Sequence, residues 1–158
     1  MGYTLKIGEL KTEVYDYEED DAPYFYHTVE TQRNEDAPAF NEPTDHTNER
    51  WPSYTAWANA MRALGLYDFM FNEESGLIRN HPDCVPLTKK HKEIIDKAYK
   101  EFYEKYPECK AGYSPNSTLT YNDPAWPEIN SYAVRLEWLK YWVDWALENC
   151  KIPAFYNS

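Results

Sequence analysis

Residues 136–148, LEWLKYWVDWALE, carry the strongest structural signal of the chain. Apolar residues recur at helical spacing in two adjacent stripes, and polar residues are left with only a narrow strip of the helix surface. The aliphatic stripe consists of Leu136, Leu139, Val143, Ala146 and Leu147, and the aromatic stripe of Trp138, Trp142 and Trp145. A helix this apolar has to be covered on more than one side. We therefore predict a central helix over about 128–150.

The composition shows which residues build the rest of the core. Of 158 residues, 17% are aromatic, with 15 tyrosines and 6 tryptophans, and the formal net charge is -11. A buried Tyr or Trp removes about 150–250 Å² from water, so aromatic side chains can supply a core that few aliphatic residues provide. The length corresponds to one domain of about 100–200 residues. We predict a single folded domain over 1–158.

Several functional classes are disfavoured by the same figures. The acidic charge argues against nucleic acid or an anionic membrane as a direct partner. No apolar stretch reaches the roughly 18 residues of a membrane span, and the first residues lack a signal-peptide core. Three cysteines, Cys84, Cys109 and Cys150, do not form a disulfide framework. These features predict a cytoplasmic protein.

The chain divides into three parts. Residues 1–30 read as an acidic β-meander of three strands, with turns at 8–11 and 18–23. Residues 31–50 read as a long polar loop, and residues 51–158 as the helical part. The predicted helices cover 54–64, 88–106 and 128–150. The predicted fold is α+β: a small N-terminal antiparallel sheet of about three strands, packed with three main helices around the Trp-rich C-terminal one.

Negative charge gathers between the second and third predicted strands. Five of six consecutive residues there are acidic: Asp16, Glu18, Glu19, Asp20 and Asp21. Such a run is typical of a solvated hairpin end. The alternative is a surface that binds a basic protein partner.

Polar side chains converge in the loop at 41–51. Its candidate ligand-binding residues, together with two from a second loop, are Asp45, His46, Asn48, Arg50, Trp51, Arg79 and His81. They could hold a small polar ligand, with the indole as a stacking wall. Alternatively, the loop satisfies its own backbone, as Asn, Asp and Thr side chains commonly do.

Recognisable catalytic chemistry is missing from the sequence. There is no nucleophile motif, no glycine-rich phosphate loop and no H-E-x-x-H. One H-x2-C pair, His81 and Cys84, falls short of the two ligand pairs typical of structural zinc. We predict no catalytic residues, no metal and no cofactor. The tryptophans Trp138, Trp142 and Trp145 fit either the core or a protein interface, and the apolar tail at 152–158 is expected to dock on the domain or on a neighbouring subunit.

Two stretches, NERWPSYTAW at 48–57 and the region 135–158, resemble uncharacterised small proteins of tailed-phage and prophage genomes. GLIR at 76–79 and His81-Pro82 add to the likeness. The resemblance implies a phage origin and a compact fold, and it implies no reaction.

Three functions remain open. The first is a non-enzymatic, acidic phage accessory protein that acts by binding, either inhibiting a host protein or sequestering a small ligand. The second is a virion or assembly protein that self-associates through its aromatic helix and tail. The third is a small enzyme that uses the Asp, His and Arg side chains of the polar loops.

Overall fold

A computed structural model describes residues 2–15, 24–39, 42–107 and 126–158. It confirms the α+β class, the antiparallel sheet and the tryptophan cluster on the C-terminal helix. The elements in chain order are β1 (Leu5–Tyr15), β2 (Tyr24–Val29), β3 (Glu49–Arg50), α1 (Tyr54–Ala63), α2 (Tyr67–Phe71), β4 (Asp83–Pro86), α3 (Lys89–Lys105), α5 (Trp126–Asn149) and β5 (Pro153–Asn157).

The sheet is antiparallel throughout and has the strand order β2-β1-β5-β4, with β3 also paired to β1. The first half of β1 pairs with β5, and its second half pairs with β2. The chain's last strand therefore lies inside the sheet, between β1 and β4. This confirms that the apolar tail docks, and it docks on the domain itself.

The strand boundaries correct the predicted meander. The first two expected strands are one strand, because β1 continues through Gly8–Lys11, where a turn was expected. A side chain at position 8 would be crowded, because a Cβ atom on Gly8 would lie 3.0 Å from Asn48 Nδ2 and 3.2 Å from Val29 Cγ1. The sheet is also not confined to the N-terminal part, since β4 and β5 come from the region predicted to be helical.

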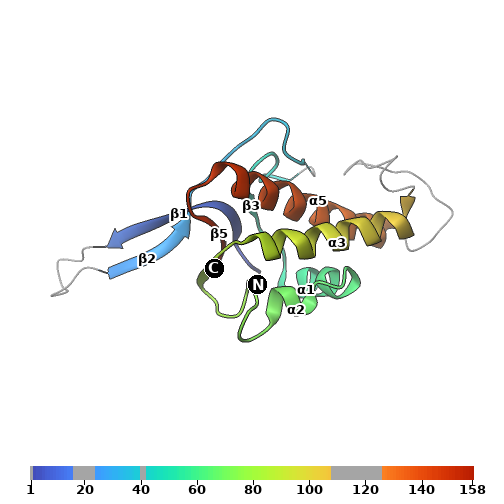
Figure 1. The fold of residues 1–158 in the computed structure, drawn as a ribbon, viewed down its shortest axis with the longest axis horizontal. Coiled ribbons are helices and arrows are strands. Elements are labelled where there is room, and N and C mark those ends of the chain that lie inside the picture. Colours follow the sequence, from blue (N-terminus) through green and yellow to red (C-terminus); the bar gives the residue numbers. More distant parts are fainter. Residues whose placement is uncertain (1, 16–23, 40–41, 108–125) are drawn as a thin grey trace.

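The second half of β1 and all of β2 form a two-stranded arm that projects from the body of the molecule (Figure 1). Val14 and Phe25 are paired across the arm and are 54% and 67% exposed. Nearer the body, Thr12 Oγ1 lies 3.2 Å from His27 Nδ1 on the same face. Val29, at the base, is buried.

The helices begin and end close to where the sequence predicts. Ser53 caps α1, its hydroxyl accepting a hydrogen bond from the Ala56 N–H. Gly65, with a φ of 70°, ends the same helix in the left-handed conformation that glycine favours. A capping box between Thr88 and His91 starts α3. A second short helix, α2, follows Gly65.

The core surrounds α5, as its two stripes predict. Fully buried side chains on this helix contact α1, α3 and the sheet, and they include Ala133, Leu136, Leu139, Trp142, Val143 and Ala146. Within the described part of the chain, no helix combines the length and apolar character needed to cross a membrane.

Candidate ligand cavity

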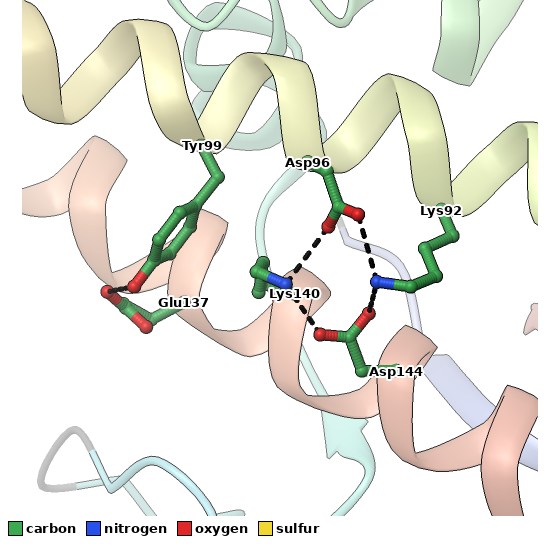
Figure 2. A network of polar contacts seen from close by, with 6 residues as sticks. All are labelled: Lys92, Asp96, Tyr99, Glu137, Lys140 and Asp144. Atoms are coloured by element: carbon green, nitrogen blue, oxygen red, sulfur yellow. Dashed lines mark hydrogen bonds and ion pairs between the residues drawn. The ribbon is translucent and has the colours of Figure 1, made fainter.

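Four charged side chains fix α3 against α5 in a closed ring (Figure 2). Lys92 Nζ lies 2.9 Å from a carboxylate oxygen of Asp96 and 2.9 Å from one of Asp144. Lys140 Nζ lies 2.9 Å and 2.6 Å from the other oxygens of the same two carboxylates. Each cation thus contacts both anions, so the ring holds the two helices in one register.

The ring changes how its members bind protons. Hydrogen bonds with Asp96 and Asp144 raise the pKa of Lys92. Burial would raise the pKa of Asp96, but the hydrogen bonds from Lys92 and Lys140 lower it below its usual value. Burial would lower the pKa of Lys140, yet its two carboxylate partners raise it. The charged forms of these three groups are therefore favoured in the fold.

Further along the same helix pair, Glu137 of α5 binds two tyrosines of α3. The hydroxyls of Tyr99 and Tyr103 donate to Glu137 Oε1 at 3.0 Å and 2.5 Å (Figure 2 shows the first of these bonds). Burial, followed by the adjacent Glu137 charge, raises the pKa of Tyr99 to about 12. The two helices are antiparallel. From the ring to these tyrosines, the contacts therefore lead toward the C-terminal end of α3 and the N-terminal end of α5.

A cavity of about 480 Å³ lies beyond this set of contacts. It is bounded by the end of α1, the last two turns of α3 and Tyr132 of α5. Its lining consists of Arg62, Ala63, Leu64, Gly65, Ala98, Glu101, Phe102, Lys105, Tyr106 and Tyr132. Small-molecule sites commonly have volumes of about 300–1,000 Å³ and combine apolar walls with a few polar groups.

Aromatic rings form much of the wall. Phe102 and Tyr106 are tilted against each other with ring centroids 5.2 Å apart. The Tyr132 hydroxyl donates to Glu128 one turn earlier in α5, which fixes its ring. No histidine, cysteine or serine is among the described residues that line the cavity. The ionisable residues of the described lining are Arg62, Glu101, Lys105, Tyr106 and Tyr132.

Two cationic side chains, one from α1 and one from α3, line the cavity. The Arg62 guanidinium stacks 4.5 Å above the Tyr67 ring and donates from Nη1 to Asn59 Oδ1 at 3.2 Å. Lys105 Nζ lies 5.3 Å from the centroid of the Tyr106 ring. Both residues are exposed, so their charged groups are accessible to a ligand.

The polar loop residues have partners within the protein, and their predicted ligand-binding role stays a prediction. Asn48 is fully buried; its Nδ2 donates to the carbonyls of Ile7 and Glu30 at 2.9 Å and 2.8 Å. Arg50 is 4% exposed, and its Nη2 lies 3.1 Å from Glu42 Oε1. Asn48 thus binds backbone groups outside the 41–51 loop, whereas Arg50 pairs with a carboxylate of the loop itself.

Other residues of the same loop also have local partners. His46 has a φ of 64°, and its Nδ1 lies 2.9 Å from the Ala37 carbonyl. The Asp45 carbonyl accepts from Arg33 Nη1. Trp51 is 57% exposed and donates to Glu49 Oε1.

Arg79 and His81 have partners outside that loop. Arg79 Nε lies 3.5 Å from Asp83, and Arg79 Nη1 donates to the Glu74 carbonyl. His81 Nδ1 lies 2.6 Å from Asn157 Oδ1, and its Nε2 lies 3.4 Å from the Tyr54 hydroxyl. None of the seven predicted ligand-binding residues lines the cavity.

The predicted interface residues divide into two groups. Trp138 and Trp142 are 1% and 0% exposed, so they lie in the core. Trp145 is partly buried and packs against Trp142 with centroids 5.3 Å apart. The acidic residues at 16–21 lie outside the described residues. Among the described residues, no group of three or more His, Cys, Asp or Glu side chains could hold a metal ion.

The sequence carries no signal for the cavity. Arg62, Lys105, Tyr106 and Tyr132 are single residues on separate helices, and they form no motif. The cavity forms only where packing brings α1, α3 and α5 together.

No protein-family model, no curated protein and no solved structure matches this chain.

Proposed function

We propose that this protein acts by binding, and that it holds a small molecule with an apolar ring system in the cavity between α1, α3 and α5. The observation that supports this most directly is the cavity itself, with its aromatic wall and its volume within the usual range for small-molecule sites. The absence of histidine, cysteine and serine from the described lining favours binding over catalysis. In the phage setting that the sequence resemblance implies, such a protein would sequester its ligand.

A neutral fluorescent probe tests the proposal. N-phenyl-1-naphthylamine (NPN), which fluoresces strongly in apolar sites, should bind the protein at one saturable site. Ala63→Trp would put a ring into the cavity, because Ala63 lines it and is exposed. This variant should lose most of the NPN binding. Thr55→Trp is the matched control, since Thr55 is exposed on the same helix and does not line the cavity.

Two results would contradict the proposal. One is the absence of saturable NPN binding by the wild-type protein. The other is equal NPN affinity in Ala63→Trp and wild type, provided that both unfold cooperatively in a thermal melt. Native mass spectrometry of the purified protein offers an independent check, because a retained ligand should appear as added mass that Ala63→Trp lacks.

A second candidate function is self-association through the projecting arm. Apolar side chains as exposed as Val14 and Phe25 are often found at protein contacts. Strand β2 is also at the edge of the sheet, where strand pairing with another chain is possible. Sedimentation velocity should then show a dimer or larger species that Phe25→Ser dissociates. Ile94→Ser, which alters an exposed apolar residue on α3, should leave it intact. A monomer at all concentrations would rule this function out.

A further inference from the structure

The two cations at the cavity differ from three of the six lysines on α3. Lys92, Lys97 and Lys100 each form an ion pair with a carboxylate. Arg62 and Lys105 form no ion pair with any carboxylate among the described residues. The chain as a whole has a net charge of -11. Two cations without a carboxylate partner among the described residues therefore make the charge at this cavity differ from that of the chain.

Arg62 is also held in place for recognition. Its stacking on Tyr67 and its bond to Asn59 use one face and one N–H of the guanidinium. A guanidinium carries five N–H donors in a planar fork, which matches the two oxygens of a carboxylate. The other donors of Arg62 therefore remain for a ligand.

The acidic groups nearby are already occupied. Glu101 lines the cavity, and Lys97 Nζ lies 3.9 Å from one of its oxygens, so its charge is partly offset. Glu128 accepts the hydrogen bond from the Tyr132 hydroxyl. These contacts leave Arg62 and Lys105 as the charges that an incoming group would meet without a counter-ion beside them.

We propose that the cavity selects an organic anion: an aromatic body lies against Phe102, Tyr106 and Tyr132, and its carboxylate or sulfonate is bound by Arg62 and Lys105. This inference rests on the proposed function, since it names the ligand class of the same site. The ring system supplies the apolar contact, and the two exposed cations supply the preference for negative charge.

A pair of related probes separates the two proposals. 1-Anilinonaphthalene-8-sulfonate (ANS) has the ring system of NPN and adds one sulfonate. ANS should bind more tightly than NPN, and the Arg62→Ala, Lys105→Ala double variant should weaken ANS about five-fold while changing NPN less than about two-fold. Lys90→Ala, on the first turn of α3, removes an exposed charge far from the cavity and should change neither affinity.

Two further measurements do not depend on the double variant. Glu101→Gln removes the acidic side chain found among the described lining residues and should strengthen ANS binding. Raising the salt concentration should weaken ANS and leave NPN unchanged, because salt screens exposed charges.

The outcomes distinguish the inference from the function on which it rests. If NPN binds and ANS binds no more tightly, or if the double variant weakens both probes equally, the anion inference is wrong and the cavity remains a neutral-ligand site. If neither probe binds, the proposed function itself fails, and the inference fails with it.

Discussion

Trp57 of α1 and Trp138 of α5 pack edge to face in the core, with ring centroids 6.3 Å apart and an interplanar angle of 84°. Both side chains are at most 1% exposed. The Trp138 indole also donates from Nε1 to the Thr47 carbonyl at 3.3 Å. One side chain of the C-terminal helix thus joins the first helix to the loop that precedes β3.

We expect Trp138→Ala to lower the free energy of unfolding by about 3–5 kcal/mol, because it removes a fully buried ring and leaves a void. Urea denaturation measures the change. Trp51→Ala is the matched control: its side chain is 57% exposed, so the cost should be about 0.5 kcal/mol or less. Equal costs for the two variants would contradict the core position of Trp138.

Asn48 gives a second prediction, because it satisfies three backbone groups. Its Nδ2 donates to the carbonyls of Ile7 and Glu30, and its Oδ1 accepts from the Gln32 N–H. Asn48→Ala leaves these groups unpaired and should cost about 3 kcal/mol or more. Asn48→Asp should cost at least as much, since a carboxylate cannot donate to the two carbonyls. Asn149→Ala, at an exposed position, should cost less than about 1 kcal/mol in the same denaturation assay.

The ring of Lys92, Asp96, Lys140 and Asp144 predicts a pH dependence. The pKa of Asp96 is lowered in the fold, so its stabilisation is complete above its usual value of 3.8 and is lost as the pH falls through the folded value. The pKa values of Lys92 and Lys140 are raised. The two lysines contribute their full stabilisation of the fold below pH 10.5, their usual pKa. This contribution is lost as the pH rises through their raised pKa values in the folded protein.

Asp96→Asn should therefore lower the stability by about 1 kcal/mol at pH 7, because these groups are partly exposed. The difference from wild type should shrink as the pH falls through the lowered pKa of Asp96, because its carboxylate is then protonated and no longer pairs with the two lysines. Denaturation at a series of pH values checks this. Glu104→Gln breaks a more exposed pair with a 3.9 Å separation and should have almost no effect. A pH-independent difference for Asp96→Asn would contradict the ionic origin.

Gly65 separates conformation from packing. Its φ is 70°, and an added Cβ would meet no atom within 4 Å. Gly65→Ala should therefore cost about 1 kcal/mol from backbone strain alone, and Gly65→Asn should cost less, because Asn adopts this conformation more readily. Thermal melts compare the two variants. A larger loss for Asn than for Ala would indicate steric conflict instead of strain.

The helices were largely predictable because their signals are local. The spacing of apolar residues identified α5 as the central helix, and Ser53 and Gly65 placed the two ends of α1. The expected helix at 88–106 is α3, Lys89–Lys105. The proposed phage origin rests on the sequence resemblance alone and stays a prediction.

The sheet was only partly predictable, because short strands have no periodic signal long enough to read. β4 has four residues and β5 has five, and each becomes a strand only by pairing with a segment far away in the sequence. The residues at 8–11 looked like a turn, yet pairing with β5 and β2 extends them as part of β1.

The α+β class, the apolar helix at the centre of the fold and the ends of the main helices could be predicted from the sequence. These features depend on residue spacing and capping within one segment. The partners of the polar residues and the position of the cavity depend on the tertiary structure. Asn48 is a candidate ligand-binding residue in the sequence, and only the fold shows that it binds three backbone groups from other segments. The cavity has the same origin, because its walls come from three helices whose ends meet only after packing.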